Sequence, residues 1–65
     1  SFNTYLTSLR MEKAKKLLLR EEKMYVKDVA EKVGYKDQFY FSRIFYSYTG
    51  VRPSEYVEKE NFGII

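Results

Sequence analysis

The chain has 65 residues, enough for one small domain, and its formal net charge of +3 comes from 12 basic and 9 acidic side chains. It contains neither cysteine nor histidine, so disulfides, thiol nucleophiles, histidine bases and the commonest transition-metal ligands are excluded, and we expect no enzymatic activity, metal or cofactor. A content of 45% hydrophobic and 18% aromatic residues excludes a disordered chain, and the lack of any run of about 18 apolar residues excludes a membrane span.

The first predicted helix covers about residues 3–20 and is apolar on two sides. At about 100° per residue, one stripe is formed by Phe2, Tyr5, Leu6 and Leu9, and the other by Met11, Ala14 and Leu18. A single core-facing stripe needs little more than a third of the circumference. We therefore expect a packing partner on each side of this helix.

Arg10 projects into the apolar arc of the same helix. A buried guanidinium needs a partner that compensates its charge. We expect an ion pair with Asp37 or Asp28 that locks the first helix to the rest of the domain.

Two further helices follow, joined by a glycine turn. The second predicted helix spans roughly residues 26–33 and ends before Gly34. Asp37 stands where an N-cap carboxylate satisfies the first free N–H groups of the third helix, residues 37–49. Gly50 follows at the position favoured for a left-handed residue that ends a helix.

The third helix has two unlike faces. The residues expected in the core recur at spacings of three and four and are Phe41, Ile44, Phe45 and Tyr48. The opposite face carries hydrogen-bonding and aromatic groups, namely Gln38, Phe39, Ser42, Arg43 and Tyr46. A short helix, a glycine turn and a second helix with such a face are the layout of a DNA-binding helix-turn-helix.

A closing helix is predicted over about residues 53–59, because Pro53 suits a first helical turn. Residues 61–65 have no helical period, and we expect a loose tail there. No repeat or linker divides the chain, so residues 1–65 are predicted to form a single DNA-binding unit.

This pattern resembles the DNA-binding domain of the AraC/XylS family of bacterial transcription regulators. The positions that fall on the motif of that family's second helix-turn-helix are Val29, Ala30, Gly34, Tyr35, Asp37, Phe41, Arg43, Phe45, Gly50, Pro53 and Tyr56. The first helix looks like the family's linker helix. Two positions depart from the motif: Val57 replaces the usual arginine, and Arg52 replaces a threonine or serine that would be a good N-cap.

The resemblance implies an all-α, homeodomain-like bundle of about four helices that is a fragment of a two-unit domain. It implies a cytoplasmic regulator that binds double-stranded DNA, with another helix-turn-helix, N-terminal to this chain, packed on the first helix. A homodimer contact along the uncovered stripe of that helix is the alternative, so a dimeric full-length protein stays open. The resemblance says nothing of the operator, the effector signal, or whether the protein activates or represses.

Four residues of the third helix are candidates for reading bases in the major groove. Arg43 can offer a bidentate fork to guanine, and Gln38 can pair with adenine. Phe39 can pack against a thymine methyl group, and Ser42 is short enough to reach a base edge or a phosphate. Arg43 could instead pair with an acid of the chain, and Phe39 could belong to the core if the helix were rotated.

Three residues are candidates for contacts with the DNA backbone: Lys27, Lys36 and the hydroxyl group of Tyr46. The alternative function is a helical protein-interaction module that uses the exposed aromatic residues Phe39, Tyr40 and Tyr46. Tyr40 lies between the two faces, and we favour a packing role for it. Salt separates the two functions, because DNA affinity falls steeply with salt concentration and an apolar protein contact hardly responds.

Overall fold

The computed structural model describes residues 1–20 and 24–64, with side chains up to residue 58, and the regular elements in these ranges are all helices. The four helices are α1 (Phe2–Leu18), α2 (Val26–Lys32), α3 (Gln38–Thr49) and α4 (Pro53–Ile64). Their number and order confirm the predicted all-α fold class. Of the connection between the first two helices, residues 21–23 lie outside the described residues.

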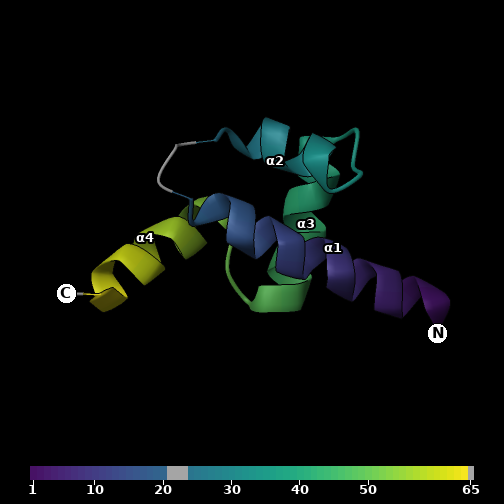
Figure 1. Cartoon of the computed structure of the whole chain (residues 1–65), viewed down its shortest axis with the longest axis horizontal. Helices are drawn as coiled ribbons and strands as arrows, with labels where there is room; N and C mark the ends of the chain where they lie inside the picture. Colours follow the sequence, from purple (N-terminus) through teal and green to yellow (C-terminus); the bar gives the residue numbers. More distant parts are fainter. Residues whose placement is uncertain (21–23, 65) are drawn as a thin grey trace.

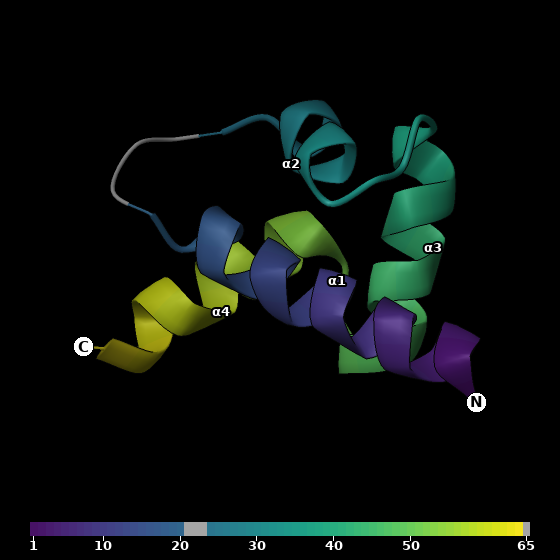
Figure 2. The same cartoon turned by 45° about the vertical axis from the view of Figure 1, so that its right-hand side comes forward.

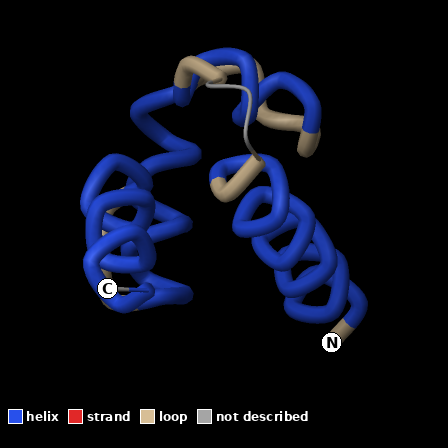
Figure 3. The backbone as a smooth tube through the Cα atoms, turned by 60° about the vertical axis from the view of Figure 1, so that its left-hand side comes forward, coloured by secondary structure: helices blue, strands red, loops and turns tan. Residues whose placement is uncertain are grey.

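The other three helices assemble on α1. It contacts α2, α3 and α4, and α3 contacts both α2 and α4. In Figures 1 and 2, α1 crosses α3, α2 lies at one end of α3, and α4 leads away beside the C-terminal end of α1. Short loops join α2 to α3 and α3 to α4 (Figure 3). The molecule measures 38 × 20 × 17 Å, and α3 has one side against α1 and another turned away from it.

The ends of α3 are set by the two residues predicted for this role. A side-chain oxygen of Asp37 accepts a hydrogen bond of 2.8 Å from the backbone N–H of Phe39, as expected of an N-cap. Gly50 has φ +87°, and its N–H donates to the carbonyl of Tyr46 at 2.8 Å. Both local predictions are therefore confirmed.

The last helix is longer than predicted. α4 continues to Ile64, so the expectation of a loose tail is wrong over residues 61–64. Once a helix is nucleated, each further residue adds one hydrogen bond, and a single glycine such as Gly63 disfavours the helix by only about 1 kcal/mol. At the other end, the backbone N–H of Arg52 donates to Oε1 of Glu55 at 3.4 Å. This contact is one half of a capping box, and it compensates for the poor N-cap.

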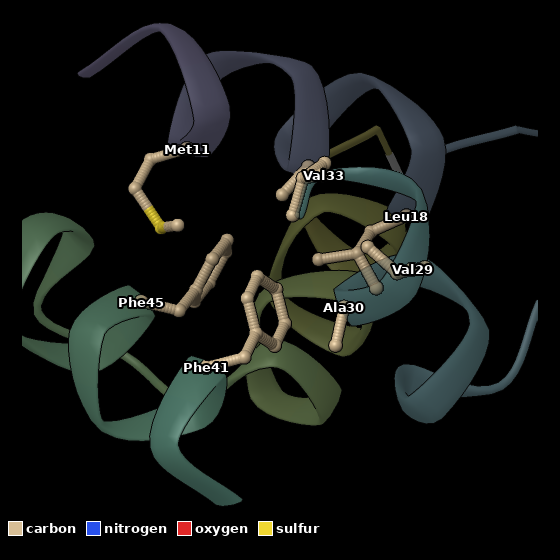
Figure 4. Packing of buried hydrophobic residues seen from close by; sticks show 8 residues of the cluster. Met11, Leu18, Val29, Ala30, Val33, Phe41 and Phe45 are labelled. Atoms are coloured by element: carbon tan, nitrogen blue, oxygen red, sulfur yellow. The ribbon is translucent and has the colours of Figure 1, made fainter. Parts of the chain in front are cut away.

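One hydrophobic core joins the first three helices (Figure 4). Its buried side chains are Met11, Ala14, Leu18, Val29, Ala30, Val33, Phe41 and Phe45. The rings of Phe41 and Phe45 lie 5.8 Å apart, and Tyr56 of α4 meets Phe45 edge-on at 5.6 Å. The two phenylalanines therefore connect α3 to its neighbours and hold it in one rotational setting.

The predicted core face of α3 is correct in its centre and wrong at its end. Phe41 and Phe45 are fully buried, and Ile44 is half-buried against the core. Tyr48 is 41% exposed, which contradicts its assignment to the core. Its hydroxyl group donates to Oε2 of Glu12 on α1 at 2.9 Å. A tyrosine can place its ring at the edge of a core and its polar end in water, and this geometry does so.

The predicted ion pair of Arg10 with Asp37 or Asp28 is not formed among the described residues. The Arg10 guanidinium instead lies over the ring of Tyr35, with 5.2 Å between Cζ and the ring centroid. Asp37 is occupied by its capping bond, and Asp28 is exposed in the first turn of α2. Arg10 therefore joins α1 to the helix-turn-helix through an aromatic ring and not through a carboxylate.

The two apolar stripes of α1 have different surroundings. Met11 and Ala14 are fully buried in the core. Phe2, Tyr5 and Leu9 of the other stripe are 74%, 62% and 50% exposed. Within the described residues, the chain therefore covers only one of the two sides that were expected to have partners.

Candidate nucleic-acid interface

The turn between α2 and α3 is closed by two backbone hydrogen bonds around a left-handed glycine. Gly34 has φ +101°, its N–H donates to the carbonyl of Glu31 at 3.1 Å, and the N–H of Tyr35 donates to Ala30 at 2.8 Å. These two bonds form a Schellman motif, which ends α2 and redirects the chain. The sequence Gly34-Tyr35 thus fixes where α3 begins relative to α2.

The core contacts of α3 determine which of its side chains face outward. At about 100° per residue, Arg43 points about 180° away from the mean direction of the buried Phe41 and Phe45. Phe39 and Tyr46 lie one turn before and one turn after Arg43, and they are 73% and 53% exposed. These three side chains form a continuous outer stripe along α3.

The other two polar candidates lie beside this stripe. Gln38 and Ser42 are half-buried; Ser42 lies four residues after Gln38, and Tyr46 lies four residues after Ser42. The predicted set therefore occupies one arc of about 140° on α3. Within it, Phe39, Arg43 and Tyr46 point away from the core, Ser42 lies at the border, and Gln38 lies about 40° from the mean direction of Phe41 and Phe45, in the first turn of the helix. We call this arc the outer arc of α3; it consists of Gln38, Phe39, Ser42, Arg43 and Tyr46.

Arg43 is exposed and is not part of an ion pair among the described residues. The ion pairs found there join Lys15 to Glu12 and Arg52 to Glu55. Among the described residues, no acid pairs with Arg43, so the alternative in which an acid of the same chain holds it is not realised there. The guanidinium can therefore offer its donors to a partner outside the chain.

Phe39 and Tyr40 are the two aromatic residues of α3 whose sequence positions left open whether they face the core or the solvent. Phe39 is 73% exposed, so the rotated helix that would bury it is excluded. The ring of Tyr40 is half-exposed and lies 5.9 Å from that of Tyr35, in agreement with the packing role favoured for it. The aromatic groups of the outer arc are thus Phe39 and Tyr46.

The two candidate lysines are exposed but lie at different ends of α2. Lys36 is in the turn, directly before the N-cap of α3, and so stands next to the start of the outer arc. Lys27 is in the first turn of α2, and the remaining five residues of that helix, about 8 Å, separate it from the turn. Lys36 is therefore the candidate closer to the outer arc along the chain.

Arg52 is a basic residue of this surface that the sequence reasoning missed. Its Cζ lies 6.0 Å from the centroid of the Tyr46 ring, and its side chain is 72% exposed. In the motif, Arg52 stands before Pro53, at the N-cap position of the last helix, where an arginine is a poor cap. The position of Arg52 two residues after Gly50 indicates this contact, because a left-handed glycine turns the chain back toward the helix that it ends.

Among the described residues, the shifted pKa values belong to groups at the junction of α1 and α3, outside the outer arc. The hydroxyl group of Tyr48 and then the ammonium group of Lys15 hydrogen-bond to Glu12 and lower its pKa below the ordinary value. The same contact with Glu12 raises the pKa of Lys15. Both shifts stabilise charged forms at neutral pH and belong to a structural contact between the two helices.

Comparison with known protein families places the fold. Residues 1–59 match a family described as "Helix-turn-helix domain". The chain belongs to the AraC-type helix-turn-helix family. The match extends over α1 as well as over the glycine turn and α3.

The relatives are bacterial regulators of transcription. The chain is 38% identical over 60 residues to the uncharacterized transcriptional regulatory protein YesN of Bacillus subtilis. The aligned region covers 91% of the chain and 16% of YesN. The chain is 44% identical over 59 residues to the raffinose operon transcriptional regulatory protein RafR of Pediococcus pentosaceus, with 91% and 20% covered. It is 49% identical over 41 residues to the arabinose operon regulatory protein of Escherichia coli, with 63% and 14% covered. No solved structure matches the chain with comparable significance.

The chain thus spans about a fifth or less of the length of these AraC-type relatives. As a member of the family, it is a helix-turn-helix domain of the kind by which bacterial transcription regulators bind specific DNA sequences. None of the helices in the described part of the chain has the length and apolarity needed to cross a membrane.

Proposed function

We propose that this AraC-type domain reads DNA by placing the outer arc of α3 in the major groove. The observation that carries the proposal is the setting of Arg43, which is exposed, outside the ion pairs of the described residues, and opposite the buried Phe41 and Phe45. An α-helix fits the width of the major groove, where each base pair presents its own pattern of donors and acceptors.

The side chains of the outer arc suit different base edges. Arg43 would donate to O6 and N7 of a guanine, and Gln38 would pair with N6 and N7 of an adenine. Phe39 is exposed enough to meet a thymine methyl group. Ser42, half-buried at the border of the arc, would reach a base edge or a neighbouring phosphate.

Contacts with the sugar-phosphate backbone would set the register of α3 on the duplex. Lys36 directly precedes the N-cap of α3, and Lys27 lies in the first turn of α2, so each would contact a phosphate from a different end of the helix-turn-helix. The hydroxyl group of Tyr46 would donate to a phosphate two turns beyond Gln38. The contacts made by these three residues would be independent of the base sequence.

The exposed stripe of α1 supports a further element of the proposal. The half of α1 that carries Phe2, Tyr5 and Leu9 has the apolar side chains of a packing surface. We assign it to a second helix-turn-helix of the same protein, N-terminal to this chain, as the family resemblance implies. Since the DNA of a bacterium lies in its cytoplasm, the proposed activity also places the protein there.

The experiment is a selection of duplexes from a random pool by the 65-residue chain, followed by titration of the selected and of a random duplex over a range of salt concentrations. For a DNA reader, the logarithm of the binding constant falls linearly with the logarithm of the salt concentration, by about 0.9 for each phosphate contact. The selected duplex should bind more tightly than the random one at every salt concentration.

The alternative, a protein-interaction module that uses Phe39, Tyr40 and Tyr46, makes the opposite prediction. Such a surface would not enrich any duplex, and its binding to a protein partner would hardly depend on salt. A failure to enrich a sequence, together with a flat salt dependence, would therefore exclude the proposed reading of DNA.

A further inference from the structure

The side chain of Arg52 reaches the outer arc of α3 although the residue precedes α4. Gly50 ends α3, and the chain turns back so that the Arg52 guanidinium lies 6.0 Å from the ring centroid of Tyr46. The Arg52 side chain is 72% exposed. A cation on the face of a tyrosine ring is held there while the N–H groups at its edge stay accessible.

We propose that Arg52 binds a phosphate group of DNA at the C-terminal end of α3, with Tyr46 as a positioning residue. The inference rests on the proposed function, because it assumes that the outer arc faces DNA. The planar guanidinium presents paired donors that match the oxygens of a phosphate group. The AraC-type motif has threonine or serine at this position, so the contact is a property of this chain.

Glu55 keeps Arg52 at this place in the free protein. Its Oε1 accepts from a guanidinium nitrogen of Arg52 at 3.4 Å and from the backbone N–H of Arg52 at the same distance. Both side chains are more than half exposed, so the ion pair is weak and a phosphate can replace the carboxylate. The carboxylate therefore orients the guanidinium and also competes with the phosphate for it.

Two substitutions of Arg52 separate phosphate binding from a role in the start of α4. Arg52→Thr restores the N-cap residue of the motif, so the unfolding temperature should stay the same or rise. Its affinity for selected and random duplexes should fall equally, by about tenfold near 0.1 M salt, and the salt slope should become shallower by about 0.9. Arg52→Gln removes the charge and keeps most of the stem, so it should show the same loss of slope.

Lys13→Ala is the matched control, because Lys13 is an exposed cation on α1 and its loss should leave the salt slope unchanged. Damage to the fold would lower both stability and affinity. If Arg52→Thr keeps or gains stability while it loses affinity for DNA, damage to the fold does not explain the loss. If Arg52→Thr failed to fold, the salt slope of Arg52→Gln would decide the matter.

Glu55→Gln tests the competition directly. The amide oxygen can still accept the backbone N–H of Arg52, whereas the negative charge is lost. Affinity for every duplex should rise about threefold, an estimate that corresponds to a weak exposed ion pair. Glu58→Gln, one turn further along α4, is the control for a general change of charge, and it should have a smaller effect.

The results distinguish this inference from the proposed function. If the unmodified chain binds DNA with a steep salt slope and both Arg52 variants keep that slope, the phosphate contact is refuted and the proposed function stands. If the unmodified chain shows no dependence on salt, both are refuted. Equal gains for Glu55→Gln and Glu58→Gln would refute the competition.

Discussion

The guanidinium of Arg10 on α1 lies over the ring of Tyr35 in the helix-turn-helix, with 5.2 Å between Cζ and the ring centroid. The same guanidinium group lies against Gly34, where a side-chain Cβ would be 3.2 Å from Arg10 Cζ. Tyr35 in turn packs against Phe41 at 5.8 Å between ring centroids. One cation on α1 thus contacts the turn that sets the start of the proposed reading helix.

Replacement of Arg10 by methionine should reduce the free energy of unfolding only modestly. The loss expected for a cation over an aromatic ring is about 0.5–2 kcal/mol. Removing one partner of a buried ion pair would instead cost about 3–5 kcal/mol. Chemical denaturation of Arg10→Met measures the loss, with Arg20→Met, an exposed residue after α1, as the control. A loss above about 3 kcal/mol would indicate that a carboxylate pairs with Arg10 after all.

The two left-handed glycines form a matched pair for substitution by alanine. Both have positive φ, 101° at Gly34 and 87° at Gly50, where an L-residue is destabilised by about 1–2 kcal/mol. The new Cβ meets Arg10 at Gly34 and meets nothing within 4 Å at Gly50. Gly34→Ala should therefore lower the unfolding temperature more than Gly50→Ala does.

A double variant separates the two causes of the loss at Gly34. In an Arg10→Met background the crowding around the new methyl group changes while φ does not, so the difference between the two glycine variants should shrink. An unchanged difference would show that the backbone conformation at Gly34, and not the packing of Arg10, accounts for the whole effect.

The parts of this molecule that the sequence predicts well depend on residues close together in the chain. Asp37 caps α3 because its carboxylate reaches an N–H two residues away, and Gly50 ends α3 because its own φ is positive. Phe41 and Phe45 share a face through the helical period alone. The positions of these residues also define the outward direction of Arg43, whereas the role of the outer arc in binding DNA stays a prediction.

Two predicted side-chain contacts were wrong, and a third contact was missed, because the partners lie on other elements of the fold. The polar partner of Tyr48 is 36 residues away on α1, so no helical period could reveal it. Arg10 was assigned a carboxylate by charge alone, whereas the fold places the ring of Tyr35 beside it. Arg52 meets Tyr46 only because the chain turns back at Gly50. In these three cases the packing of the helices determines the partner, whereas the helical state of residues 61–64 follows from the local continuation of α4.

The contact between Tyr48 and Glu12 predicts a dependence of stability on acid. The pKa of Glu12 is lower in the folded chain than its ordinary value of 4.5. The ionised carboxylate therefore stabilises the fold at any pH above 4.5, and this stabilisation is lost as the pH falls through the pKa of the folded chain. Tyr48→Phe removes the hydroxyl group that is the largest cause of the shift. The pKa of Glu12, followed by NMR, should then rise toward 4.5.

Lys15→Met is the comparison variant, because Lys15 lowers the pKa of Glu12 through a second hydrogen bond and through its positive charge. Its effect on the pKa of Glu12 should have the same sign as that of Tyr48→Phe. If Tyr48→Phe left the pKa of Glu12 unchanged, the hydrogen bond between α1 and α3 would not be formed in solution.

The N-cap of α3 supplies a test of how firmly the proposed reading helix is anchored. Asp37→Ala removes the oxygen that accepts from the N–H of Phe39 at 2.8 Å, and the free energy of unfolding should fall by about 0.5–2 kcal/mol. Asp37→Asn keeps an acceptor oxygen and should retain most of that stability. Equal losses in both variants, measured by urea denaturation, would mean that the charge of Asp37 matters more than its hydrogen bond.

Arg43 and Lys36 should respond differently to the base sequence of the DNA. Arg43→Ala removes a bidentate contact with a guanine, so it should weaken binding to the selected duplex by about 1–3 kcal/mol and relax the preference at one base position. Lys36→Ala removes a contact with a phosphate, so it should weaken all duplexes by a similar factor and make the salt slope shallower. Competition titrations with duplexes substituted at each position in turn measure both effects.

The outward position of Arg43 makes this comparison decisive for the proposed orientation of α3. The substitution lies opposite the core, so it should leave the unfolding temperature unchanged, and a loss of binding then reports on the interface alone. An equal loss on selected and random duplexes would assign Arg43 to the phosphate backbone and would rotate the reading face of α3 away from it. A loss confined to one base pair would instead identify the base pair that Arg43 contacts. Gln38 and Phe39 would then contact the neighbouring bases that lie toward the N-terminal end of α3.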